Sequence, residues 1–292
     1  MPKLKGCPCT DYKANKDASG NCSLNRGPDG YAIQCVGDWA LQKHDILRRY
    51  IEATSGPRAK YRPPVGRGGA AFIDMFAGPG MSCIRDTGEI IDGSPLIALC
   101  HTRAPFTSLV FCDLNADNIS ALESRTSAAN DRVSIVHGDC NQCVGDILDL
   151  VPEYGLNVAL IDPFGPSVLH GNTLRSLGEV KRMDFIIHFP TNGLKRYFGK
   201  RGFGQTIDNL VGNTDWRSEI RHARDVPKLI KYLRRNLVSI GYDKEQVRSL
   251  PIKNSRNRAL YHLMFATKHD LGNKIWGSIA RIGPGGQREL DL

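Results

Sequence analysis

Short apolar runs alternate with amphipathic stretches along most of this chain. The runs are typical of buried strands and predict strands at residues 70–76, 108–112, 132–137, 156–161, 184–189, 246–252 and 259–267. Apolar residues at helical spacing predict helices from residue 94 and near 116–128, 144–150, 173–181, 215–240 and 272–282. Strands that alternate with helices imply right-handed crossovers and a mostly parallel sheet. The pattern therefore predicts an α/β, Rossmann-like fold.

The start of the chain departs from this rhythm. Residues 1–35 are polar and rich in cysteine, with no sustained periodicity, so we expect a small Cys-rich N-terminal appendage. Residues 36–292 form the α/β domain in this interpretation, with a basic helical insertion at about 191–245. A helix is expected over 37–54, with Trp39, Ile46, Leu47, Tyr50 and Ile51 on its buried face and Lys43, Arg48 and Arg49 facing water.

Composition describes an ordinary globular protein with a basic surface. The chain is 41% hydrophobic and 24% charged, with a formal net charge of +9. No apolar run approaches the roughly 20 residues that a bilayer span needs, and the N-terminus lacks an apolar secretory core. We therefore expect a cytoplasmic protein with reduced thiols and no membrane partner.

The basic residues are clustered rather than spread evenly. One group lies at 195–201, a second at 217–235 and a third at 253–258. Clustered Lys and Arg side chains favour polyanions, because neutralised phosphates release their counterions. A solvated basic surface is the alternative, but the clustering favours a nucleic acid, DNA or RNA, as partner.

The strand predicted at 70–76 ends in an acidic residue and a tight glycine turn, which is typical of a ligand site. Gly78 and Gly80 carry no Cβ, so the backbone can turn sharply and approach a ligand closely. Asp113 follows the next strand and would hold a ribose diol, and Asp139 follows the third and would accept from an adenine amine. The expected cofactor-binding residues are Asp74, Phe76, Ala77, Gly78, Gly80, Asp113, Leu114, Asp139 and Cys140.

A dinucleotide site is the competing interpretation of this turn. Its fingerprint requires a third glycine that opens a helix and an acidic residue about 20 positions later. The third glycine is missing here, and residues 81–93 separate the turn from any helix. This insert, with Thr87 and Gly88 as its turn, is expected to form a short hairpin over the pocket. S-adenosylmethionine needs no phosphate cradle and fits the pattern better.

A second acidic turn, Asp162-Pro163-Phe164-Gly165, follows the strand predicted at 156–161. It resembles the Asp/Asn-Pro-Pro-aromatic motif of amino-methyltransferases and the corresponding motif of tRNA guanine-N2 methyltransferases. A carboxylate that accepts hydrogens from an exocyclic amine would orient its lone pair, and an aromatic ring would stack on the base. Asp162, Pro163 and Phe164 are the expected catalytic residues. Those expected to bind substrate are Gly165, His188, Asn192, Lys195 and Arg196.

The alternative for this motif is a tight bend with no chemistry, and for His188 a structural role. Methylation at C5 of a pyrimidine would need a cysteine after the fourth strand. No cysteine follows Cys143 in the sequence, so that route is excluded.

Four cysteines near the N-terminus suggest a structural metal. Cys7, Cys9, Cys22 and Cys35 could close a tetrahedral zinc site in a segment too polar to bury much core. Their spacing lacks the paired knuckles that are usual for zinc, so reduced, unliganded thiols remain the alternative.

Several segments together resemble the three-Cys-motif partner protein family. They are residues 39–51, 72–80, 92–99, 161–165 and 261–269, with Trp276 nearby. The resemblance implies a class I methyltransferase-like fold, whose mostly parallel sheet has one antiparallel late strand. It also implies a link to a separate radical-enzyme-like protein, whose three cysteines give the family its name.

We therefore expect an S-adenosylmethionine-dependent methyltransferase that acts on an exocyclic or ring amine of a nucleic acid or nucleobase. One rival is a non-catalytic nucleic-acid-binding subunit that keeps the fold. The other is a metal-dependent hydrolase that uses carboxylates such as Asp74 and Asp162.

Overall fold

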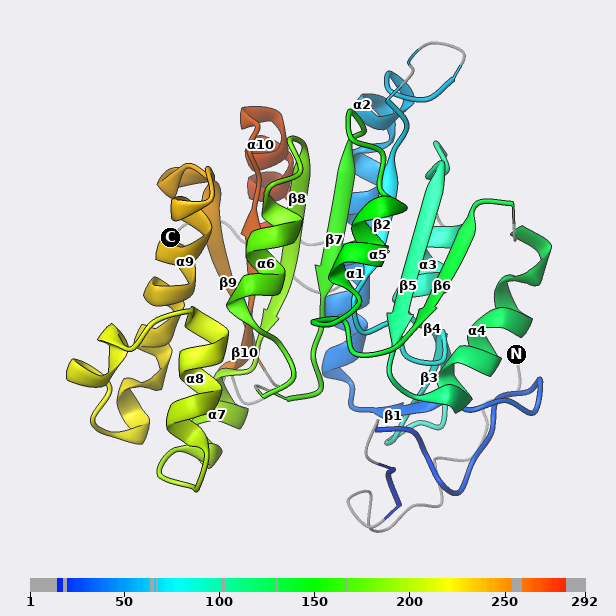
Figure 1. Cartoon of the computed structure of the whole chain (residues 1–292). Coiled ribbons are helices and arrows are strands. Elements are labelled where there is room, and N and C mark those ends of the chain that lie inside the picture. The colour runs from blue at the N-terminus through cyan, green and yellow to red at the C-terminus, as the bar shows by residue number, and fades with distance from the viewer. Residues whose placement is uncertain are drawn as a thin grey trace.

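A seven-stranded sheet runs through the centre of the protein (Figure 1). The computed structural model describes residues 15–17, 20–63, 66, 68–100, 103–129, 131–165, 167–253 and 259–281. The strands of this sheet are β2 (Ala71–Asp74), β5 (Ser108–Asp113), β6 (Val133–His137), β7 (Asn157–Ile161), β8 (Met183–Phe189), β9 (Val247–Lys253) and β10 (Ala259–Ala266). Their order across the sheet is β6-β5-β2-β7-β8-β10-β9.

The direction of the strands confirms the predicted fold class. The pairs β2–β5, β5–β6, β2–β7 and β7–β8 are parallel, whereas β10 is antiparallel to both of its neighbours. Counted within this sheet alone, the order is 3-2-1-4-5-7-6. The chain thus has a class I methyltransferase-like sheet with one antiparallel late strand, and its switch point lies beside β2.

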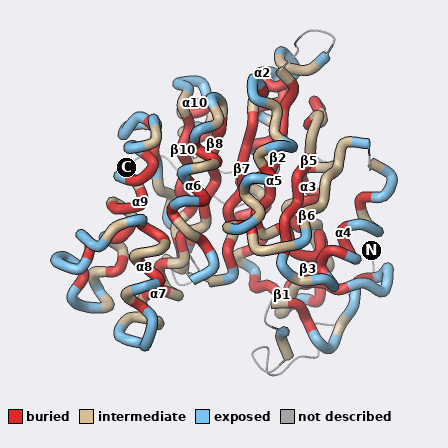
Figure 2. Tube along the Cα trace, viewed as in Figure 1, coloured by how far each residue is buried: buried red, intermediate tan, exposed pale blue. Residues whose placement is uncertain are grey.

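Helices cover both faces of the sheet (Figures 1 and 2). One face carries α5 (Val144–Asp149), α6 (Gly171–Gly178), α8 (Phe203–Val211) and α9 (Leu229–Ser239); the other carries α1 (Trp39–Ala53), α3 (Ser94–Cys100), α4 (Ala116–Thr126) and α10 (Asp270–Ala280). Side chains alternate along each strand, so Ile73 packs into the first layer and Phe72 into the second. In the described part of the chain, no helix is long and apolar enough to cross a membrane.

The basic stretch after β8 is broken into short pieces. It contains α7 (Thr191–Tyr197), α8, the 3₁₀ turns η2 (Asp215–Ser218) and η3 (Ala223–Lys228), and α9. The prediction of a helix over most of 215–240 is wrong in its first half. Pro227 lies inside η3, and proline cannot continue an α-helical ladder, so α9 begins only at Leu229. The remaining short helices are α2 (Ser55–Ala59), η1 (Ser127–Ala129) and η4 (Lys244–Gln246).

A second, three-stranded sheet joins the N-terminal segment to the domain. It contains β1 (Gln34–Val36), β3 (Met81–Ile84) and β4 (Ile90–Asp92), with β1 parallel to β3. The pair β3–β4 is the predicted hairpin, and Gly88 adopts a φ of 71° in its turn. Since β1 pairs with a strand of the domain, a separate N-terminal appendage is not confirmed.

The layer of α1 and α10 should contribute strongly to stability through Phe265 of β10. This side chain is fully buried and stacks on Trp276 with ring centroids 4.5 Å apart. We expect Phe265→Ala to lower the free energy of unfolding by about 3–5 kcal/mol, because it leaves a cavity that the sheet cannot close. Leu271→Ala on α10, where the side chain is 53% exposed, should change it by less than about 0.5 kcal/mol. Urea titrations measure both, and equal losses would contradict the assignment.

Candidate active site

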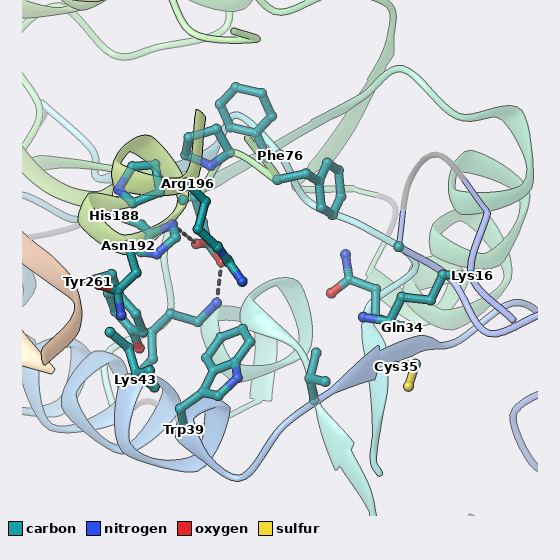
Figure 3. A pocket seen from close by; sticks show the side chains of 18 of the residues that line it. Lys16, Gln34, Cys35, Trp39, Lys43, Phe76, His188, Asn192, Arg196 and Tyr261 are labelled. Carbon is teal, nitrogen blue, oxygen red and sulfur yellow. Dashed lines mark hydrogen bonds and ion pairs between the residues drawn. The ribbon is translucent and has the colours of Figure 1, made fainter. Parts of the chain in front are cut away.

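A cavity of about 650 Å³ opens at the carboxyl edge of the sheet. Its walls come from α1, the turn after β7, β8 with α7, β10, and the N-terminal segment ahead of α1. Figure 3 shows Lys43, His188 and Asn192 on one side and Lys16 and Gln34 on the other. Nine predicted site residues line this cavity: Phe76, Asp162, Pro163, Phe164, His188, Asn192, Lys195, Arg196 and, from the predicted metal set, Cys35. The structure therefore brings the predicted reaction residues together.

Asp162 lies at the centre of the cavity between two basic side chains. The parallel register pairs Ile161 with Ile187, so Asp162 and His188 follow at adjacent strand ends. Asp162 Oδ1 lies 3.2 Å from His188 Nδ1. Lys43 Nζ donates a hydrogen bond to Asp162 Oδ2, and both contacts are drawn as dashed lines in Figure 3. His188 Nδ1 has no partner in hydrogen-bonding geometry among the described residues, so Lys43 is the group that holds the carboxylate.

The expectation that Lys43 faces water is wrong. Its side chain is only 10% exposed, and its ammonium group lies 5.5 Å from the ring centre of Trp39. The helical period explains the placement, since Lys43 is four residues after Trp39 and four before Leu47 on the same buried face. A lysine within an apolar stripe is the signal that was available in the sequence.

The charges around Asp162 fix its protonation. Burial alone would raise the pKa of Asp162, but the positive charge of Lys43, with a smaller contribution from His188, holds that pKa below its ordinary value. Burial lowers the pKa of His188 to about 4, although Asp162 acts in the opposite direction. At neutral pH the cavity therefore holds an ionised carboxylate, a neutral imidazole and a lysine.

Aromatic rings form the wall beside these groups. Tyr261 lies edge-on to His188, with ring centres 4.3 Å apart, and edge-on to Trp39 at 5.7 Å. Burial raises the pKa of Tyr261 well above its ordinary value, so its hydroxyl stays protonated. Asn192 Nδ2 donates to Ala259 O at 2.8 Å, which fixes the orientation of its amide in the cavity. Trp39 and Tyr261 open two of the segments that carry the family resemblance, but neither of them was predicted to have a role in the site.

Asp74 is close to this centre but does not line the cavity. It is fully buried, and its Oδ1 accepts from Phe76 N at 3.3 Å. Its Oδ2 has no partner in hydrogen-bonding geometry within the described residues, although the Ser94 hydroxyl is near enough to lower its pKa. Burial and the charge of Asp162 outweigh that contact and raise the pKa of Asp74 to about 7.

The carboxylate of Asp113, the expected ribose contact, is hydrogen-bonded within the protein. It is 4% exposed and lies outside the cavity lining. Its Oδ2 accepts from Gly78 N at 2.8 Å, and its Oδ1 accepts from Asn115 N and Asn118 Nδ2, both at 2.9 Å. Gly78 and Gly80 form the expected turn with φ values of 62° and 84°. In this conformation the carboxylate of Asp113 accepts three hydrogen bonds from the chain itself.

The other predicted cofactor residues also lie outside the cavity lining. Ala77 and Gly80 are buried in the turn. Gly165, which was predicted to bind substrate, does not line the cavity either. Leu114 is 70% exposed. Asp139 Oδ1 accepts from the backbone and side-chain nitrogens of Asn141, which closes its own loop, and Cys140 is buried. Burial raises the pKa of Cys140 to about 12, so it remains a thiol.

The described residues do not support the predicted zinc site. Cys7 and Cys9 lie outside them. Cys22 and Cys35 are buried in a small apolar cluster with Ile33 and Cys83. Across the described ranges, no group of three or more His, Cys, Asp or Glu side chains could hold a metal ion.

The Lys43–Asp162 ion pair should control stability in a pH-dependent way. Without Lys43, burial raises the pKa of Asp162, so the folded state then binds a proton more tightly than the unfolded state. We expect Lys43→Met to lower the free energy of unfolding by about 3 kcal/mol at pH 8, and by less at pH 5, where the carboxyl is protonated more easily. Urea unfolding at both pH values, with exposed Lys60→Met as the matched control, measures this; equal losses at both would contradict the pairing.

Asp74 should destabilise the folded protein as pH rises. The unfolded carboxyl ionises near its ordinary pKa of about 3.9, whereas burial holds the native pKa at about 7. Between these values the native state binds more protons, so stability falls as pH rises through the interval. The side chain introduced by Asp74→Asn cannot ionise. We therefore expect the free energy of unfolding of Asp74→Asn to be about 2–4 kcal/mol higher than that of the wild type at pH 8, and nearly equal to it at pH 4. Urea titrations test this, and a gap that does not change with pH would disprove it.

The chain resembles several solved structures only distantly. Neither family models nor curated proteins give a match. A Legionella pneumophila protein of the DUF519 family is 11% identical, with a TM-score of 0.48 over 83% of this chain and 94% of that one. M. jannaschii TYW2 in complex with AdoMet is 9% identical, with a TM-score of 0.42 over 85% of this chain and 85% of that one. The SAM-bound magnesium protoporphyrin IX methyltransferase of Synechocystis PCC 6803 is 10% identical, with a TM-score of 0.39 over 79% of this chain and 80% of that one. The fold assignment rests on the strand order of the chain itself, and membership of the three-Cys-motif partner family stays a prediction.

Proposed function

We propose that this protein is an S-adenosylmethionine-dependent methyltransferase acting on an exocyclic or ring amine of a nucleic acid or nucleobase. The observation that carries the proposal is the ionised Asp162, which opens the turn with Pro163 and Phe164 and faces a cavity of about 650 Å³. S-adenosylmethionine would supply the methyl group. The protein's own task is to present the amine.

An exocyclic amine on a base is a poor nucleophile, because its lone pair is delocalised into the ring. A fixed carboxylate that accepts an amine hydrogen draws electron density onto the nitrogen and orients the lone pair. One oxygen of Asp162 accepts a hydrogen bond from Lys43, which orients the carboxylate, and the other lies 3.2 Å from His188 Nδ1. This arrangement supports a positioning function for a carboxylate that is already charged.

The lowered pKa of Asp162 supports a function in orienting the amine, and not in taking up the amine proton. A general base works best when its pKa is near the working pH. Lys43 holds the pKa of Asp162 below its ordinary value against the effect of burial, so the carboxylate does not retain a proton at neutral pH. The amine proton therefore passes on to water, and Asp162 acts by orientation.

Phe164 and the basic residues support a nucleic-acid substrate. The Phe164 side chain is 48% exposed and lines the cavity, where it can stack on a flat ring. Lys195 and Arg196 of α7 line the same cavity. Residues 191–240 carry eleven Lys and Arg against four Asp and Glu, a net charge of +7 out of +9 for the chain. A polyanion would bind this region next to the reactive centre.

The family resemblance adds a three-Cys-motif radical-enzyme-like partner to the proposal. A metal-dependent hydrolase is less well supported, because no described cluster could hold a metal and Asp74 lies outside the cavity lining. A non-catalytic nucleic-acid-binding subunit is the remaining rival. It would bind nucleic acid without transferring a methyl group.

Replacing Asp162 tests the proposed chemistry. We expect Asp162→Asn to reduce methyl transfer by at least about 100-fold, because the amide is a weaker acceptor than the carboxylate. Cofactor affinity should stay within about fivefold, since the change acts on the reacting amine. Radiolabelled methyl incorporation into purified total RNA, DNA and mononucleosides measures transfer, and calorimetry measures cofactor binding. Full turnover by the variant would refute the assignment.

The variant leaves Lys43 without its partner, so a stability control is needed. Lys43→Met combined with Asp162→Asn removes both charges and should recover most of the lost stability. It should remain inactive, because no carboxylate is restored. Asp131→Ala, at an exposed position, is the matched control and should keep full activity. Activity in the double variant would show that stability, and not the carboxylate, limits the single variant.

A further inference from the structure

The N-terminal segment from residue 20 to residue 36, here called the strap, forms one wall of the cavity. Gly20, Gln34, Cys35 and Val36 of the strap line it. Figure 3 shows Gln34 and Cys35 across the cavity from His188 and Lys43. The strap ends in β1, which pairs with β3 of the domain.

The strap contacts the glycine turn through Gln34 and the reaction motif through Gly20. A Cβ on Gly78 would lie 2.7 Å from Gln34 Nε2, so the Gln34 amide fills the space that the missing side chain leaves for a ligand. A Cβ on Gly20 would lie 3.7 Å from the ring of Phe164, which places the strap backbone against the reaction motif. Gly20 therefore borders the reaction cavity at Phe164, and Gln34 separates Gly78 from it.

Hydrogen bonds connect the strap to the buried acid at the end of β5. Asn21 Nδ2 donates to Asn118 Oδ1 at 2.7 Å, and Asn118 Nδ2 donates to Asp113 Oδ1 at 2.9 Å. Asp113 therefore has no pair of oxygens left to receive a ribose diol. Asn21 Oδ1 is buried without a hydrogen-bond partner in the described part of the chain, so the closed strap carries an unsatisfied polar atom.

Arg125 of α4 fastens the strap to the turn. Its Nε and one terminal nitrogen bind both carboxylate oxygens of Asp29, at 2.7 and 2.8 Å. The other terminal nitrogen donates to Ala32 O at 2.9 Å and to Pro79 O. One guanidinium thus holds two strap residues and the glycine turn together.

We propose that the strap is an autoinhibitory element that covers the glycine turn and, through Asn118, holds Asp113 closed, and that S-adenosylmethionine binds only when residues 20–33 and the side chain of Gln34 leave the glycine turn. The proposal rests on the proposed function, since it concerns the cofactor of that same site.

A closed strap lowers apparent cofactor affinity by the fraction of molecules that are open. Weakening its fastening should therefore raise affinity, whereas damage to a true cofactor contact would lower it. Asp29 is suited to this test, because it binds Arg125 at the protein surface and lies outside the cavity lining. Asn21→Ala weakens the strap independently, through the bond to Asn118.

Calorimetry with S-adenosylmethionine on the full chain tests the proposal. We expect Asp29→Ala and Asn21→Ala each to bind about 3- to 10-fold more tightly than the wild type, and the pair together more tightly still. Glu123→Ala, an exposed carboxylate on α4, is the matched control and should leave affinity unchanged. Thermal melts show whether each variant is folded. Hydrogen exchange should rise in residues 20–34 of the wild type when the cofactor is added.

The outcomes separate the strap from the proposed function. Unchanged or weaker binding by both folded variants, or a strap that becomes more protected when the cofactor binds, overturns the strap and leaves the methyltransferase in place. No binding by the wild type or by either variant overturns both. Tighter binding by the variants, with no transfer to any nucleic acid, keeps the strap and rejects the proposed substrate.

Discussion

The Lys43–Asp162 ion pair is the interaction on which the reaction half of the site depends. A carboxylate withdrawn from water needs a partner, or it takes up a proton and loses its charge. Lys43 is supplied by α1 and Asp162 by the end of β7, so the pair also fixes the first helix against the sheet edge. The same contact therefore sets the charge of the centre and the position of one cavity wall.

The two halves of the site differ in how ready they are for a ligand. Around Asp162 the polar groups line a cavity of about 650 Å³. Around Asp113 the acceptors are already taken by Gly78, Asn115 and Asn118. Because a carboxylate has about four acceptor positions, three internal donors leave too few for a diol. The two regions therefore differ in how many carboxylate acceptor positions are already hydrogen-bonded within the protein.

Much of the fold could be predicted from the sequence, because the parallel strands appear as apolar runs, and β2, β5, β6 and β7 end at or just before an aspartate. The residues of the reaction motif and its neighbour His188 were predicted for the same reason. Lys43 was missed because its charge suggests a solvent-exposed position, although its helical spacing places it on the buried face. The helix predicted over 215–240 was too long, because Pro227 interrupts its first half. The saturation of Asp113 could not be predicted, since it depends on Asn118 and, through it, on Asn21, 97 residues earlier.

The position of β1 decides whether strap movement can disturb the reaction half. Only Gly37 and Asp38 separate β1 from Trp39, the first residue of α1, so a shift of β1 would reach the helix that carries Lys43. Gly37 is closely packed, because a Cβ there would lie 2.7 Å from Trp39 Nε1. The ladder of β1 with β3, from Gln34 to Val36, holds this end in place. Opening is therefore confined to the residues before the ladder and to the side chain of Gln34, which leaves the Lys43–Asp162 pair intact while the glycine turn is uncovered.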